Sequence, residues 1–77
     1  MKYIREDKFI KGLGANIKKI RVENKLTQNQ LAFESGLTLS QISRIELGII
    51  NTSVSHIFII AQVLDITPKQ LFDFDIK

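Results

Sequence analysis

The chain has 77 residues, no cysteine and one histidine, and its formal net charge is +3 at neutral pH. Its length allows one domain, and the lack of cysteine excludes disulfides and thiolate metal sites. Leu, Ile, Val and Phe make up 29 of the residues, which is well above the roughly 20% below which chains stay disordered. A core this small depends on well-capped helices, on oligomerisation or on both.

The basic residues concentrate early, since residues 1–25 hold eight of the 11 Lys and Arg. This balance permits a nucleic-acid partner. The longest apolar run, residues 57–61, is far shorter than the roughly 20 residues that span a bilayer. No apolar segment follows the charged N-terminal residues either, so no export signal is expected. We therefore expect a cytoplasmic protein without a membrane partner.

Three Thr-x-x-Gln stretches predict helix starts, because the Thr hydroxyl can accept from the backbone N–H three residues on while the Gln side chain reaches back. They begin at Thr27, Thr38 and Thr67. Pro68 suits the first helical position of the third helix. Gly36 and Gly48 fall where the first two of these helices would end, since glycine readily adopts the left-handed conformation there. Asn24 and Asp65 are expected to play the same part less comfortably.

These signals and the spacing of apolar side chains predict five helices. The expected ranges are 8–23, 28–35, 39–47, 54–64 and 68–72. Strand signals are poor, because no Asn-Gly hairpin and no sustained alternation occur. The expected fold is an all-α, compact five-helix bundle in one domain over 1–77, with its core in 9–72, an arm at 1–7 and a tail at 74–77.

Residues 28–47 predict two short helices joined at Gly36. Ala32 is small enough to let the two helices cross closely. Three apolar side chains would point inward and fix the angle between the helices: Leu37, Ile42 and Ile45. This is the plan of a helix-turn-helix, whose second helix enters the major groove of double-stranded DNA.

This segment resembles the Cro/phage-repressor-like helix-turn-helix family, also called XRE. The residues that match the family pattern in register are Ile20, Arg21, Leu26, Thr27, Gln28, Leu31, Ala32, Gly36, Ile42, Ser43, Ile45, Glu46 and Gly48. The match continues through Asn51, Ala61, Leu64 and Leu71, so it covers roughly residues 9–72. The resemblance implies a lambda-repressor-like domain and a sequence-specific transcription regulator. No enzyme activity, cofactor, metal or small-molecule substrate is expected.

The resemblance also implies roles for particular residues. Gln28 matches a family glutamine that contacts a DNA phosphate. Within the second helix of the pair, Arg44 suits guanine, Gln41 suits adenine, and Leu39 suits a thymine methyl. The expected DNA-binding residues are Thr27, Gln28, Thr38, Leu39, Ser40, Gln41, Ser43, Arg44, Asn51, Thr52 and Ser53. Arg21 and Glu46 match a structural ion pair of the family.

Two features concern partners other than DNA. The helix at 54–64 is apolar nearly all round, which favours either a buried core helix or a homodimer interface. One apolar face, expected to face the core, carries Val54, Ile57, Phe58, Ala61 and Leu64, and a second carries Ile59, Ile60 and Val63. The residues expected at that interface are Ile49, Ile50, Ile59, Ile60, Val63, Phe72, Phe74 and Ile76. Apolar residues near the recognition helix favour an alternative function, a protein-interaction or antitoxin-like module with weak or lost operator recognition. These residues are Leu39, Leu47, Ile49 and Ile50. Lys18, Lys19 and Arg21 are expected to form a solvated helix face.

Overall fold

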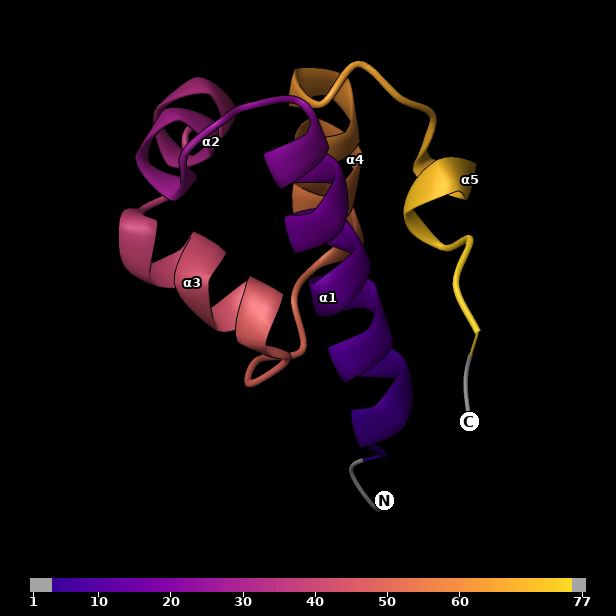
Figure 1. The fold of residues 1–77 in the computed structure, drawn as a ribbon. Helices are drawn as coiled ribbons and strands as arrows, with labels where there is room; N and C mark the ends of the chain where they lie inside the picture. The colour runs from indigo at the N-terminus through magenta and orange to yellow at the C-terminus, as the bar shows by residue number, and fades with distance from the viewer. Residues whose placement is uncertain (1–3, 76–77) are drawn as a thin grey trace.

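The computed structural model describes residues 4–75, which form five helices and no strand. The helices are α1 (Asp7–Glu23), α2 (Gln28–Ser35), α3 (Leu39–Leu47), α4 (Val54–Val63) and α5 (Pro68–Leu71). In Figure 1, α2 and α3 lie on one side of the long helix α1 and α5 lies on the other. The predicted all-α fold is confirmed, and each predicted helix boundary lies within one residue of the observed one. Over residues 4–75 no helix combines the length and apolar character needed to cross a bilayer.

The ends of α2 and α3 form through local chemistry. The Thr27 hydroxyl accepts from the Gln30 backbone N–H at 3.0 Å, and the Gln30 side-chain oxygen accepts from the Thr27 N–H at 2.7 Å. Thr38 and Gln41 repeat the arrangement at 3.0 and 2.9 Å. Gly36 follows α2 with a φ of 75°, a left-handed conformation that costs glycine little. The capping boxes predicted at Thr27 and Thr38 are confirmed. At the third predicted box the Thr67 N–H donates to the Gln70 side-chain oxygen at 3.0 Å, and the Gln70 N–H donates to the Thr67 carbonyl at 3.0 Å.

The turn after α1 differs from the prediction. Lys25, not Asn24, takes the left-handed conformation, with a φ of 59°. Asn24 keeps a negative φ of −85°, and its side-chain amide donates to the Leu64 carbonyl at 3.1 Å. The contact across the molecule thus determines which residue makes the turn. Asp65 has a φ of 59°, as predicted for the turn after α4.

The core lies where the five helices meet. Its completely buried side chains are Ile17, Leu31, Ile42, Ile60, Leu64 and Leu71. Ile45 is also buried, and Leu37 packs against the core from the turn between α2 and α3. These positions agree with the inward orientation predicted for the helix pair.

Helix α4 orients its apolar faces differently from the prediction. Ile60 is 0% exposed, because α4 turns the face with Ile57, Ile60 and Ala61 toward the core. Ile60 therefore cannot meet a partner subunit, and its assignment to a dimer interface is wrong. Val54 and Phe58, expected on the core-facing side, are instead 86% and 51% exposed.

Helices α1 and α3 approach each other with their backbones in close contact. A Cβ atom on Gly14 of α1 would lie 2.2 Å from the Ile45 carbonyl oxygen of α3. A Cβ on Gly48 would lie 2.6 Å from the Cα of Lys11. Only glycine fits at these two positions, and the absence of side chains there places α1 directly alongside the second half of α3.

Candidate nucleic-acid interface

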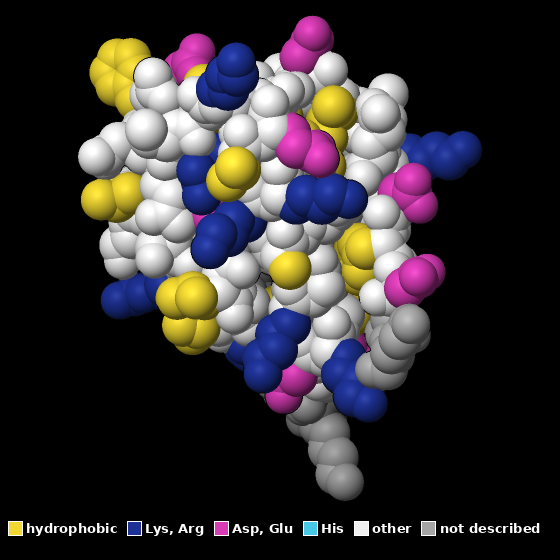
Figure 2. Space-filling model, viewed as in Figure 1, with side chains coloured by type: hydrophobic (Ala, Val, Ile, Leu, Met, Phe, Trp, Pro, Cys, Tyr) yellow, Lys and Arg dark blue, Asp and Glu magenta, His cyan; other side chains and the backbone are white. Residues whose placement is uncertain are grey.

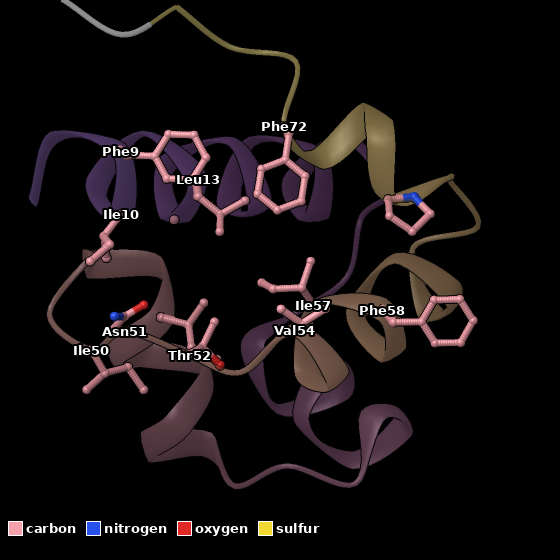
Figure 3. Close-up of a pocket in the computed structure, with 13 residues that line it drawn as sticks. Phe9, Ile10, Leu13, Ile50, Asn51, Thr52, Val54, Ile57, Phe58 and Phe72 are labelled. Carbon is pink, nitrogen blue, oxygen red and sulfur yellow. The ribbon is translucent and has the colours of Figure 1, made fainter. Parts of the chain in front are cut away.

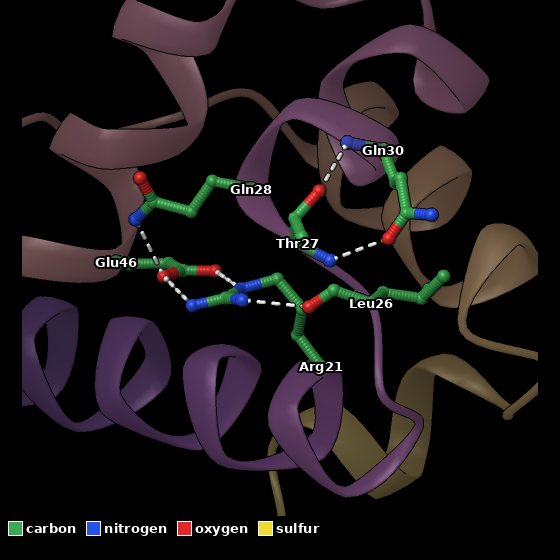
Figure 4. A network of polar contacts seen from close by, with 6 residues as sticks. All are labelled: Arg21, Leu26, Thr27, Gln28, Gln30 and Glu46. Atoms are coloured by element: carbon green, nitrogen blue, oxygen red, sulfur yellow. Dashed lines mark hydrogen bonds and ion pairs between the residues drawn. The ribbon is translucent and has the colours of Figure 1, made fainter.

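A buried ion pair joins α1 to the end of α3. The Arg21 Nε atom donates to Glu46 Oε2 at 2.6 Å, and Nη2 donates to Oε1 at 3.1 Å. The guanidinium also donates to the Leu26 carbonyl at 2.8 Å (Figure 4). The predicted structural ion pair is therefore present, and three hydrogen bonds hold it.

The same carboxylate holds the start of α2. The Gln28 Nε2 atom donates to Glu46 Oε1 at 2.9 Å, so one acceptor serves both α1 and α2 (Figure 4). Gln28 is half-buried, and this contact fixes its amide beside the N-terminus of α2. Two interactions therefore set the angle between α2 and α3: apolar packing in the core, and the hydrogen bond from Gln28 to Glu46.

The outer face of α3 carries the side chains predicted to contact bases. Ser40 and Arg44 are exposed, Ser43 is half-buried, and Leu39 is exposed at the first position of the helix. Gln41 is different, because its side-chain oxygen accepts from the Thr38 N–H within the helix cap. A bidentate contact to adenine uses the same oxygen, so the cap and the base contact would share one acceptor.

The loop between α3 and α4 contains the polar residues predicted to contact phosphate. The Ser53 hydroxyl accepts from the His56 backbone N–H at 3.1 Å and caps α4. The Thr52 hydroxyl lies 3.3 Å from His56 Nδ1. These contacts fix the loop to the start of α4. The loop directly follows α3, the proposed recognition helix, in the sequence.

Sequence reasoning missed a cation at this loop. The Arg5 guanidinium donates to the Ile49 carbonyl and forms a 2.6 Å ion pair with Asp7. It thereby fastens the segment before α1 to the α3–α4 loop. Residues 5 and 49 are 44 positions apart, so no local pattern in the sequence indicates the contact.

An apolar groove of about 310 Å³ lies between α1, α4 and the start of α5. Figure 3 shows Phe9 and Phe72 on one side of it, and Val54 and Ile50 on the other. The rings of Phe9 and Phe72 stack with their centroids 5.8 Å apart. Phe9 is therefore partly exposed at the edge of this groove.

The residues predicted for a dimer interface divide among several environments. Ile49 and Phe72 are exposed, and Ile50 and Phe72 line the groove. The half-buried members of the set are Ile50, Ile59, Val63 and Phe74. Ile60 lies in the core, and Ile76 lies outside the described residues.

The fold and the arrangement of α2 and α3 define a helix-turn-helix protein. A helix-turn-helix family model matches residues 17–71, and the chain belongs to this XRE-type family of DNA-binding transcription regulators. Proteins of this family are not enzymes, which agrees with the expectation from the sequence.

Its relatives include restriction–modification controllers. The chain is 39% identical over 62 residues to control protein C.BamHI of Bacillus amyloliquefaciens, which covers 79% of this chain and 76% of the relative. The structure of the restriction–modification controller C.AhdI from Aeromonas hydrophila matches with a TM-score of 0.80 and 36% identity, covering 82% and 96% of the two chains. The biofilm regulator SinR, solved in complex with DNA, matches with a TM-score of 0.75 and 31% identity, covering 79% and 98%.

Proposed function

We propose that the protein is a sequence-specific, homodimeric transcription regulator of the controller type, acting on paired DNA half-sites in the cytoplasm. One observation carries the proposal: the outer face of α3 is held rigidly at both ends. Thr38 caps its start, and Glu46 ties its end to Arg21 and Gln28. A recognition helix fixed in this way enters the major groove in one orientation.

Base contacts come from the outward side chains of α3. Arg44 has the geometry to donate two hydrogen bonds to guanine, and the hydroxyls of Ser40 and Ser43 suit several base edges. Leu39 offers an apolar contact to a thymine methyl. Gln41 donates through its Nε2 atom while its oxygen remains in the cap.

Phosphate contacts come from the ends of helices beside α3. Thr27 and Gln28 stand at the N-terminus of α2, where free backbone N–H groups and the helix dipole attract an anion. Thr38 offers the same chemistry at the start of α3. The loop residues Asn51, Thr52 and Ser53 lie at the start of α4. These contacts position the protein on the duplex without distinguishing sequences.

A second copy of the chain is proposed to cover the apolar groove. The proposed interface is centred on Val54, Phe58 and Phe72, with Ile49 and Ile50 at its edge. It keeps Ile49, Ile50 and Phe72 of the set expected from the sequence and adds Val54 and Phe58, which line the groove. It leaves out the buried Ile60 and the half-buried Ile59, Val63 and Phe74. Each such side chain that leaves water contributes about 1.5–3 kcal/mol before association costs. A two-fold dimer presents two copies of α3 to half-sites about 34 Å apart.

The test is binding to the DNA upstream of the protein's own gene and to a scrambled fragment of the same length. We expect operator binding that is at least a thousandfold tighter than binding to the scrambled fragment, the order typical of specific regulators. Equal affinity for both fragments would contradict the proposal. It would favour the alternative protein-interaction module, which the exposed Leu39, Leu47 and Ile49 beside the recognition face support.

A further inference from the structure

A second groove, distinct from the apolar one, lies between α1 and the second half of α3. It has a volume of about 700 Å³. From α1 it is lined by Lys11, Lys18 and Lys19, from α2 by Gln28, and from α3 by Ser43 and Leu47. Figure 2 shows Lys and Arg side chains distributed over this face of the molecule, along α1 and beside α3. The groove thus borders Gln28 of α2 and Ser43 of α3, which are both proposed to contact DNA.

Helical spacing and close packing together place the lysines there. Lys11 and Lys18 are seven residues apart, so they lie on one side of α1, about 10 Å apart along its axis. The backbone contacts at Gly14 and Gly48 bring this side of α1 against α3. Without these two glycines α1 would stand farther from α3, and its lysines would be separated from the recognition helix.

The charge in the groove is not cancelled inside the protein. Among residues 4–75 the ion pairs are Arg5–Asp7 and Arg21–Glu46, and neither uses these lysines. Glu46, the acid at the floor of the groove, is neutralised by Arg21. Glu23 is the other acidic side chain lining it, against three lysines. The net charge of the groove is therefore positive.

We infer that a sugar-phosphate strand of the bound duplex lies along this groove, with Lys11 and Lys18 as its contacts. The inference rests on the proposed function, because the strand belongs to the duplex whose major groove receives α3. Charge complementarity supports it, and so does continuity: Gln28, proposed to contact a phosphate, lines the same groove. The lysines of α1 then form a binding surface, in place of the solvated helix face expected from the sequence.

The test is a salt series on single variants that each remove one positive charge. Lys11→Gln and Lys18→Gln preserve the first two side-chain carbons, and Lys11 needs these for its contact with Gly48. Lys69→Gln is the matched control, because Lys69 is exposed on α5, on the opposite side of α1 from α3 (Figure 1). Affinity for the operator and for scrambled DNA is measured at each salt concentration.

We expect Lys11→Gln and Lys18→Gln each to reduce the slope of log affinity against log salt by about one per bound protomer, equally on both DNAs. Lys18→Arg should restore the slope, and Lys69→Gln should leave it unchanged. A wild-type slope in both groove variants, or the same loss in Lys69→Gln, would overturn the inference while leaving the proposed function intact. Wild-type protein without operator preference would instead overturn the proposed function and, with it, this inference.

Discussion

The outer face of α3 and the apolar groove between α1 and α4 are both exposed, but their exposed groups suit different partners. At α3 the helix start is capped by Thr38 and the helix end is tied to α1, so its remaining exposed groups suit water or DNA. In the apolar groove Phe58 and Phe72 remain 51% and 42% exposed, although the Phe72 ring stacks on Phe9.

The two surfaces therefore differ in their proposed roles: the face of α3 binds DNA, and the groove binds a second copy of the chain. The face of α3 is complete within one chain and requires a charged, hydrogen-bonding partner. The groove requires another apolar surface, because contiguous exposed apolar area marks an interaction site. Substitutions on the first surface should change DNA affinity without changing the oligomeric state, and substitutions on the second should act through the oligomeric state.

The largest expected effect comes from the buried ion pair at the end of α3, beneath the DNA-binding surface. Glu46→Gln removes the charge partner of Arg21 and leaves a buried guanidinium without its counterion, which costs about 3–5 kcal/mol. In a domain of this size each kcal/mol lowers the melting temperature by about 4–8 °C. Thermal unfolding followed by circular dichroism measures the change, with the exposed Glu34→Gln as the control.

An unchanged melting temperature combined with lost DNA binding would contradict this interpretation. Such a result would show that the protein tolerates the loss of the ion pair. Glu46 would then be assigned to the DNA-contacting surface and not to the scaffold.

The next effect tests the apolar groove. Phe58→Lys places a charge where a partner subunit is proposed to pack, and it removes a contribution of about 1.5–3 kcal/mol per protomer. Sedimentation should show a shift from dimer to monomer at micromolar concentration, with far-UV helicity retained. Phe33→Lys is the matched control, because Phe33 is 87% exposed on α2, outside the groove. A dimer that survives Phe58→Lys would place the interface elsewhere.

Arg44→Ala tests the other surface. The loss of a bidentate contact to guanine should cost about 1–3 kcal/mol on the operator and relax the preference at one base pair. Binding titrations on operator and scrambled DNA measure this cost, and sedimentation should show an unchanged dimer. Equal weakening on both DNAs would assign Arg44 to a phosphate contact.

The smallest effect concerns the cap of α3. Thr38→Ala removes the acceptor for the Gln41 backbone N–H and should cost about 1 kcal/mol of folding stability. Chemical denaturation measures this loss. If Gln41 also contacts adenine through its oxygen, weakening the cap should change operator preference as well, and an unchanged preference would leave Gln41 as a capping residue only.

The parts of the fold that depend on neighbours in sequence could be predicted from the sequence. The bounds of α2 and α3 follow from Thr27, Thr38, Gly36 and Gly48, because capping involves residues within a few positions of each other. The pairing of Arg21 with Glu46 could be predicted because both residues match a structural ion pair of the family that the sequence resembles.

The parts that depend on tertiary packing could not be predicted in the same way. An apolar helix such as α4 does not indicate by its pattern which stripe faces the core, so Ile60 and Val54 were assigned to the wrong sides. The contact between Arg5 and the Ile49 carbonyl joins distant segments through one hydrogen bond. Both roles of Gln41, the helix cap and the adenine contact, could be predicted from the sequence, and the structure shows the cap.

The Arg21–Glu46 pair also constrains how the chain acquires its structure during synthesis. Arg21 leaves the ribosome 25 residues ahead of its buried partner, so α1 and α2 cannot close over the guanidinium until the end of α3 has been made. Leu71, completely buried, and the Asn16 amide, which donates to the Leu71 carbonyl at 2.8 Å, extend that dependence to α5. A peptide of residues 28–47 alone should therefore lack stable helix by circular dichroism. We expect the DNA-binding motif to fold only together with α1 and α5.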